Sequence, residues 1–196
     1  MRGGALLLVG LATACAHLPG GRAIRDCPGP LAQTQTLGDD FLARERIEIE
    51  SGDRSVRLDL AIQKRAGELA IVGFDPVGPK LFQVVQRGTE LEVEALPGRV
   101  LAVPPENVLR DVHRVRFLGI GMPPGGSGEV VARRDGARIS ETWHGGQLLA
   151  RRFEPAGGGR AVVVEFPAQA GGPVWIRAPG CGYEAKITSL SERALP

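Results

Sequence analysis

The feature of this chain that most limits its fold is a run of alternating apolar and polar residues that begins at Arg46. In residues 47–50 isoleucine alternates with glutamate, and in residues 56–63 valine, leucine and isoleucine alternate with mostly polar residues. Successive side chains of a β-strand point to opposite faces, so this alternation predicts strands with one buried and one solvent-facing side. The fold is therefore expected to be based on a sheet.

The same pattern predicts further strands downstream. They are expected over residues 68–74, 80–87, 89–95, 129–134, 137–143, 147–153, 161–166, 174–178 and 183–189. The short connections Asp135-Gly136 and Gly145-Gly146 are typical of hairpin turns. Consecutive strands should therefore pair as an antiparallel meander.

One segment breaks the alternation, and it begins at Pro104 and Pro105. Apolar residues then recur at three- and four-residue steps: Val108, Leu109, Val112 and Val115. This spacing predicts one amphipathic helix, which a Gly- and Pro-rich loop over residues 119–128 should end. His113 is expected on the solvated face of this helix.

About eleven strands and one helix, without alternation of strand, helix and strand, predict a mainly β (α+β) fold. We expect an antiparallel open half-barrel wrapped around one or more helices, with a closed barrel as the alternative. The 196 residues, less a leader, suffice for one domain with a real core.

The N-terminus has the features of a lipoprotein leader. Arg2 precedes a short apolar run over residues 4–14, and Cys15 follows small residues. A basic start, an apolar stretch and a small-residue cut site make a secretory signal, and a cysteine at the cut marks a lipoprotein. We expect a signal peptide at residues 1–14, a lipidated N-terminus and linker at residues 15–45, and the folded domain at residues 46–191.

The apolar run is much shorter than the roughly 20 residues that span a bilayer, so acyl chains on Cys15 would hold the domain at the membrane. Ala16 follows the cysteine, where aspartate would resemble a signal for retention in the inner membrane. The predicted location is therefore the periplasmic face of the outer membrane. An ordinary signal peptide or a wrongly set start codon is the alternative.

The chain has three cysteines. If Cys15 is acylated, Cys27 and Cys181 remain as the only pair in an oxidising compartment, and a disulfide between them would close a loop of about 150 residues. Two free thiols are the alternative. The three histidines are scattered and no Cys-x-x-Cys occurs, so neither a metal site nor a cofactor is predicted.

Charge and motifs give little support to nucleic-acid binding or catalysis. The net charge of +2 comes from 24 basic and 22 acidic residues without a basic block. The sequence has no Gly-x-Ser-x-Gly, no His-Glu-x-x-His and no phosphate-binding loop. Glu90, Glu92 and Glu94 alternate along one predicted strand, which fits solvent exposure better than an acid and base pair. An envelope hydrolase is the least favoured function.

Three stretches in this order resemble the LolA/LolB family of bacterial lipoprotein-localisation proteins, and especially its outer-membrane receptor type. They are residues 74–81 with an Asp-Pro-Val-Gly-Pro turn, residues 107–124 with the helix and a Pro-rich loop, and a final meander from residue 139 to 189. The resemblance covers roughly residues 46–191. The chain also resembles, more closely, an uncharacterised family of bacterial lipoproteins, a domain of unknown function, with the same pattern.

The resemblance implies a half-barrel with an apolar concave cavity for acyl chains, capped by helices, and a membrane-facing loop with an apolar tip. Val77 occupies the tip, where the receptor type has leucine, and a plain tight turn is the alternative there. The residues expected to line or cover the cavity are Leu58, Leu60, Ile71, Phe82, Val84, Leu91, Val93, Leu109, Val112, Phe117 and Trp143. An ordinary filled core is the alternative for them.

Two functions follow from these expectations. The first is a non-enzymatic outer-membrane-anchored lipoprotein that binds acyl chains or lipoproteins for trafficking or insertion, with a periplasmic carrier protein as a partner. The second is an envelope scaffold or assembly lipoprotein without a lipid cavity, for example in polyene-lipid export. A packed interior would favour the second.

Overall fold

The computed structural model describes residues 24–97, 101 and 103–196, so the predicted signal peptide and Cys15 lie outside the described residues. Eleven strands form one antiparallel sheet in the order β5-β4-β3-β2-β1-β11-β10-β9-β8-β7-β6. Their bounds are β1 Phe41–Ser51, β2 Arg54–Arg65, β3 Glu68–Phe74, β4 Lys80–Arg87, β5 Glu90–Ala95, β6 Gly128–Arg134, β7 Ala137–His144, β8 Gln147–Pro155, β9 Val162–Glu165, β10 Val174–Ala178 and β11 Tyr183–Ala194.

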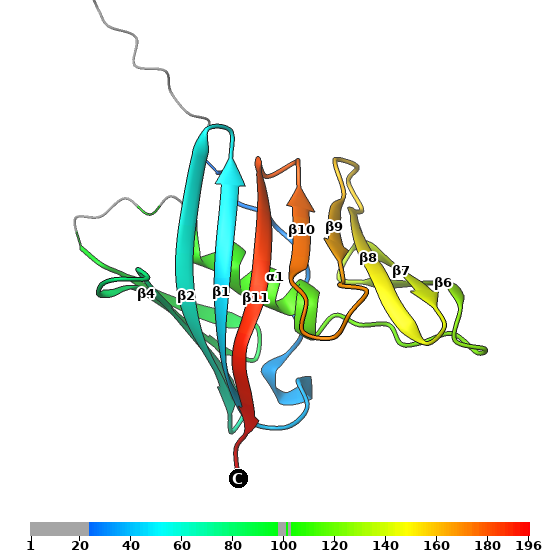
Figure 1. Cartoon of the computed structure of the whole chain (residues 1–196), viewed down its shortest axis with the longest axis horizontal. Coiled ribbons are helices and arrows are strands. Elements are labelled where there is room, and N and C mark those ends of the chain that lie inside the picture. The colour runs from blue at the N-terminus through cyan, green and yellow to red at the C-terminus, as the bar shows by residue number, and fades with distance from the viewer. Residues whose placement is uncertain (1–23, 98–100, 102) are drawn as a thin grey trace, which may run out of the picture.

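The sheet consists of two meanders joined at the centre. Strands β1 to β5 pair in sequence, strands β6 to β11 do the same, and β1 pairs with β11 to connect the halves. Strands β5 and β6 remain as the two edges, so the sheet is open, and the expectation of a half-barrel is confirmed (Figure 1). The β6–β7 turn has positive φ at Asp135 and Gly136, 45° and 77°, as a type I′ hairpin requires.

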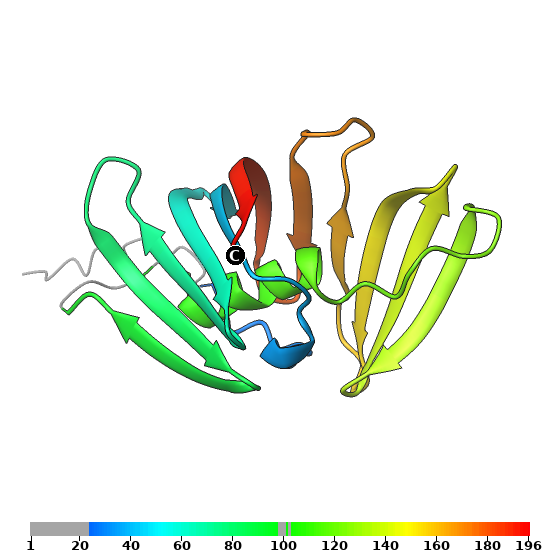
Figure 2. The ribbon, with the colours of Figure 1, turned by 90° about the horizontal axis from the view of Figure 1, so that it is seen from below.

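Helix α1, Pro105–Arg116, lies across the concave side of the sheet (Figure 2). Pro105 stands in the first turn, where a missing N–H costs nothing, and the helix ends before Phe117. The buried Val108, Leu109 and Val112 belong to the same hydrophobic cluster as the concave face. The helix therefore fills the centre of the half-barrel.

Residues 24–40 precede β1, and we call them the N-terminal strap. The strap runs along the open side of α1 and contains a short 3₁₀ turn at Thr34–Thr36 (Figure 2). Cys27 and Thr34 are fully buried in it. This segment was expected to be linker, and β1 was expected to begin at Arg46 and not at Phe41. Glu45 is buried at a position of β1 where the alternation calls for an apolar residue. The pattern is interrupted there, so the first residues of the strand were not predicted.

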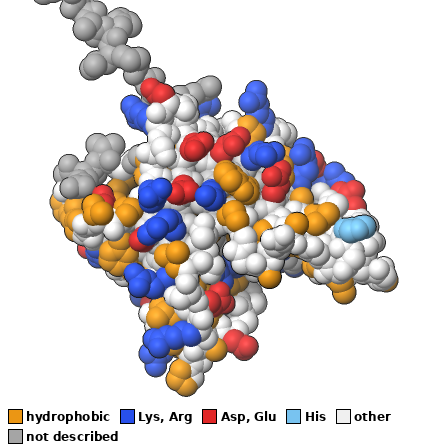
Figure 3. Space-filling model, viewed as in Figure 1, with side chains coloured by type: hydrophobic (Ala, Val, Ile, Leu, Met, Phe, Trp, Pro, Cys, Tyr) orange, Lys and Arg blue, Asp and Glu red, His pale blue; other side chains and the backbone are white. Residues whose placement is uncertain are grey.

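Basic and acidic side chains are scattered over the convex face, with apolar side chains between them (Figure 3). Cross-strand ion pairs such as Arg46–Asp59 and Lys186–Glu48 lie on it. Glu90, Glu92 and Glu94 are exposed on the edge strand β5, as predicted. Within the described part of the chain, no helix has the length and apolarity needed to cross a bilayer.

Candidate functional site

A disulfide fixes the N-terminal strap to the end of the sheet. Cys27 and Cys181 are bonded with a Cα–Cα distance of 5.2 Å, which confirms the predicted pairing. Beside the disulfide, the backbone N–H of Arg25 donates to the Cys181 carbonyl at 3.1 Å. The two cysteines are 154 residues apart in sequence, so the bridge connects the start of the described chain to the turn before β11.

Asn107 of α1 holds the same part of the strap. Its Oδ1 accepts from the backbone N–H of Cys27 at 2.8 Å, and its Nδ2 donates to the Arg25 carbonyl at 2.8 Å. The side chain is fully buried, so losing either partner would leave an unsatisfied polar group. The strap is therefore a specified layer of the fold.

His113 is buried between the strap and β4, so its predicted position on a solvated face is wrong. Its Nδ1 accepts from the backbone N–H of Ala32 at 3.2 Å, and its Nε2 lies 2.6 Å from Gln86 Oε1. Gln86 also donates to the Ala32 carbonyl at 2.9 Å. Burial lowers the pKa of His113 to about 4, which keeps the ring neutral.

A second buried group on α1 consists of Asp111 and Arg114. Arg114 Nη1 donates to Asp111 Oδ1 at 2.7 Å, and its Nη2 donates to the carbonyls of Cys27 and Pro28, each at 3.1 Å. Tyr183 donates its hydroxyl to Asp111 Oδ2 at 2.7 Å. Burial raises the pKa of Asp111 despite the neighbouring guanidinium. The pair is neutral overall and serves to bind strap, helix and sheet together.

Two more charged clusters lie at the C-terminal end of α1. Arg151 of β8 pairs with Glu141 of β7, Nε to Oε1, at 2.6 Å and donates to the Val115 carbonyl at 3.1 Å. Arg116 bonds Glu45 of β1. Arg151 is 5% exposed, and this burial lowers the pKa of its guanidinium.

Most residues predicted to line a lipid cavity belong to the buried hydrophobic cluster, and their contact with an acyl chain stays a prediction. Leu58, Leu60, Ile71, Phe82, Val84, Leu109 and Val112 are buried in the main hydrophobic cluster, and Leu91 and Phe117 pack partly against it. Val93 is 39% exposed on the edge strand β5. Trp143 lies outside the cluster and donates from Nε1 to Glu141 Oε2 at 3.2 Å.

Val77 stands at the tip of the β3–β4 hairpin, where it is 97% exposed. Asp75 organises the turn, because its Oδ1 accepts from the Val77 N–H and its carbonyl accepts from the Gly78 N–H, both at 3.1 Å. The tight turn and the exposed apolar tip thus occur together. Insertion of this tip into a membrane stays a prediction.

An open cavity lies between the strap and the ends of β7, β8 and β9, away from the predicted cavity residues. Its volume is about 330 Å³, and it is lined by Pro28, Gly29, Pro30, Arg114, Asp135, Gly136, Ala137, Phe153, Pro155, Ala156 and Val162. Sequence reasoning missed this site because the strap supplies one wall. The alternation in β8 could have indicated the site, because it places Phe153 on the same concave face as Arg151, two residues earlier.

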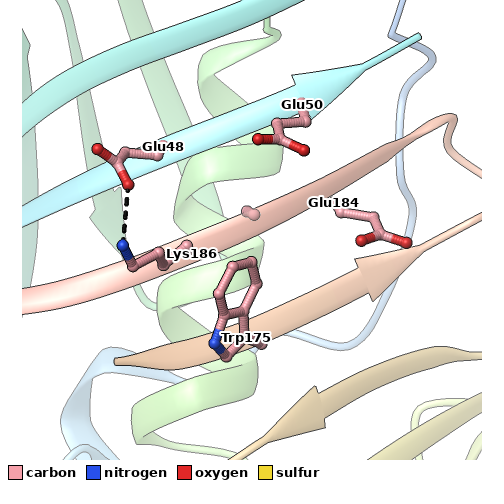
Figure 4. A pocket seen from close by; sticks show the side chains of 6 residues that line it. Glu48, Glu50, Trp175, Glu184 and Lys186 are labelled. Carbon is pink, nitrogen blue, oxygen red and sulfur yellow. Dashed lines mark hydrogen bonds and ion pairs between the residues drawn. The ribbon is translucent and has the colours of Figure 1, made fainter. Parts of the chain in front are cut away.

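A smaller hollow, of about 160 Å³, lies on the convex face, at strands β1, β11 and β10 (Figure 4). Trp175 is 41% exposed there, and Lys186 lies 5.9 Å from its ring centre. Glu48, Glu50 and Glu184 surround the two side chains. Among the described residues, no group of three histidine, cysteine or acidic side chains is placed to hold a metal ion.

A family model described as "Protein of unknown function (DUF3261)" matches residues 42–191. No curated protein matches the chain. Among solved structures, a LolA superfamily protein from Nitrosomonas europaea is 12% identical with a TM-score of 0.47, covering 85% of this chain and 96% of its own. An outer membrane lipoprotein-sorting protein domain from Vibrio parahaemolyticus is 8% identical with a TM-score of 0.38, covering 80% and 85%. A DUF1329 family protein from Desulfovibrio piger is 14% identical with a TM-score of 0.38, covering 83% and 88%.

Proposed function

The chain belongs to the DUF3261 family of proteins of unknown function, and for this member we propose a non-enzymatic role in binding acyl chains or lipoproteins. The domain would be held at the periplasmic face of the outer membrane by acyl chains on Cys15. A periplasmic carrier protein would be its partner in lipid or lipoprotein trafficking.

The observation that carries this proposal is an open cavity on the concave face. Phe153 and Val162, which belong to the same hydrophobic cluster as α1, line this cavity with their apolar side chains at β8 and β9. Ligand pockets in proteins have volumes of about 300 to 1,000 Å³ and are mostly apolar, and this cavity meets both conditions. Lipid binding is therefore proposed at the β7 to β9 end of the sheet.

Two further features support an envelope location. The Cys27–Cys181 disulfide fits an oxidising compartment such as the bacterial periplasm. Val77 presents an almost fully exposed apolar side chain on a hydrogen-bonded turn, a suitable shape for contact with a lipid surface. The anchor on Cys15 would keep this tip close to the bilayer.

The test is the lipid content of the intact protein. We expect the full-length chain, purified from its own membrane in mild detergent, to carry a non-covalent lipid that solvent extraction releases in near-stoichiometric amount. Mass spectrometry of the N-terminal peptide should show an acylated Cys15. A protein of the same size, purified identically, controls for carry-over. Equal amounts of lipid from both proteins would contradict the proposal.

The burial of apolar side chains such as Leu60 and Phe82 beside α1 favours a second candidate, an envelope scaffold or assembly lipoprotein. The hollow around the exposed Trp175 on the convex face supports this second candidate, because aromatic residues are enriched at protein interfaces. Affinity capture of the intact chain from solubilised membranes distinguishes the two. Recovery of one stable protein partner without bound lipid would establish the scaffold.

A further inference from the structure

The cavity beside the N-terminal strap has a volume that limits its occupant. At about 330 Å³ it lies at the small end of the range for ligand sites. Such a space suits one acyl chain and not the several chains of a mature lipoprotein or phospholipid together. A ligand of this cavity would therefore have a single chain.

Its walls are apolar where a hydrocarbon tail would lie. Phe153 and Val162 are neighbours across β8 and β9 on the concave face, and both are buried. Pro28 and Pro30 of the strap form the opposite wall, and Ala137 lies at the end. None of these side chains offers a hydrogen-bonding group, so a tail meets no unsatisfied polar partner.

Arg114 is the one cationic side chain that lines the cavity, and both of its terminal nitrogens are already hydrogen-bonded. Asp111 neutralises it, and the strap carbonyls of Cys27 and Pro28 accept its Nη2 protons. The strap backbone lies so close that a side-chain carbon on Gly29 would stand 2.8 Å from Nη2. Arg114 is therefore a structural wall residue, and recognition of a charged head falls to other groups.

Arg134 supplies a positive charge next to the cavity. It lines an adjoining hollow that shares Asp135, Ala137 and Ala156 with the cavity, and it pairs with Ala137 across the β6–β7 hairpin, so both side chains lie on the concave face. Its guanidinium donates to the Gly119 carbonyl at 3.2 Å and forms no ion pair within the described residues. Asp135 is the carboxylate that lines the cavity here, whereas nearby Glu154 is already bonded to Arg138 and Arg152.

We propose that this cavity binds one single-chain fatty carboxylate, with the tail between Phe153, Val162 and the strap prolines and the carboxylate at Arg134. The proposal rests on the lipid-binding function above and adds the class of ligand and its orientation. A carboxylate fits because guanidinium groups bind carboxylates through two parallel hydrogen bonds. Binding of the tail in this cavity does not displace α1 or the strap.

The experiment uses the full-length chain in detergent micelles and a fatty acid with a photoreactive diazirine in its chain. Cross-linked peptides are identified by mass spectrometry, and labelling is measured against probe concentration. We expect labels on residues 28–30 and 153–162. Labels confined to strands β1 to β5 would overturn the proposed site and still leave lipid binding intact. Labelling no greater than that of a heat-unfolded sample would remove both proposals.

Matched variants test the two ends of the ligand. Ala156→Trp fills the cavity from an exposed position, and Ala170→Trp adds the same side chain at an exposed position that lines none of the cavities described above. Arg134→Glu reverses the charge next to the cavity, and Arg133→Glu does so on the opposite face of the same strand.

We expect Ala156→Trp to weaken labelling about tenfold, equivalent to about 1.4 kcal/mol, with Ala170→Trp unchanged. Arg134→Glu should weaken labelling by the acid about tenfold and leave labelling by its methyl ester unchanged, whereas Arg133→Glu changes neither. Equal effects within either pair, or equal losses for acid and ester, would overturn the proposed orientation.

Discussion

The imidazole of His113 joins α1 to β4 and to the N-terminal strap, with Nε2 2.6 Å from Gln86 Oε1 and Nδ1 accepting from the Ala32 N–H at 3.2 Å. An Nδ1 that accepts a hydrogen bond cannot carry a proton, so this arrangement requires the neutral ring. Burial lowers the pKa of His113 to about 4 and so supports the same protonation state. Attachment of the strap therefore depends on pH.

Acidification is expected to weaken the fold through His113. The ordinary pKa of 6.5 applies to the unfolded chain, so between pH 6.5 and about 4 the unfolded state binds more protons than the folded state. The contribution is complete above pH 6.5 and falls by about 3 kcal/mol as the pH decreases through this window. Asp111 acts in the opposite sense, because its raised pKa favours protonation in the folded state.

Urea denaturation of the wild type and of His113→Gln across this window measures the effect. The amide of glutamine does not titrate, so the free energy of unfolding of the variant should depend less on pH. Other carboxylates, such as Asp40 with its lowered pKa, are common to both proteins and cancel in the difference. Parallel pH profiles would show that His113 does not control the strap.

Removal of the disulfide is expected to cost stability. A bridge with a sequence separation of 154 restricts the unfolded chain strongly, and Cys27→Ser with Cys181→Ser should lower the free energy of unfolding by about 2 to 5 kcal/mol. Denaturant titration of the wild type with and without reductant checks this value. The double variant is the control, since reductant should leave it unchanged.

The buried pair of Arg151 and Glu141 should show strong coupling. Arg151→Met alone leaves Glu141, which is fully buried, without its positively charged partner and should destabilise the domain by about 3 to 5 kcal/mol. Adding Glu141→Leu should recover part of this loss, because the uncompensated charge is gone. A double-mutant cycle by urea denaturation gives the coupling. Additive effects of the two substitutions would argue against a buried pair.

Val77 is expected to enter the lipid surface. An environment-sensitive dye on Val77→Cys, in the full-length chain inserted into vesicles, should shift its emission to the blue. Val131→Cys, also an exposed apolar position but on the edge strand β6, should not shift. In parallel, Val77→Asp should slow transfer of a lipid to acceptor vesicles, and Val77→Leu should not. Equal dye emission at the two positions would mean that the tip stays in water.

Much of the fold could be predicted because the strands follow simple alternation. The bounds of β3 and β4 agree with the predicted ones, since glycine or proline turns end each strand. The pairing of Cys27 with Cys181 was predictable because no other pair remained once Cys15 was assigned to a lipid. Alternation also identified the inward faces of β2 and β4.

The candidate site was less predictable because the strap has no periodicity. Residues 24–40 are held by backbone hydrogen bonds, the disulfide and polar side chains of α1, and such contacts leave no pattern along the sequence. The polar face of α1 therefore looked solvated, and His113 and Arg114 were not recognised as buried. Alternation also cannot distinguish a filled core from a hollow one, so it left open whether buried residues such as Leu60 and Phe82 face an acyl chain or only other core side chains.

The most direct test of the account is a crystal structure of the chain with a long-chain fatty carboxylate. The account predicts one acyl chain between Phe153, Val162 and the strap prolines, its carboxylate at Arg134, with α1 and the disulfide unmoved. An empty cavity at saturating ligand, or a chain bound only after α1 leaves the concave face, would contradict it.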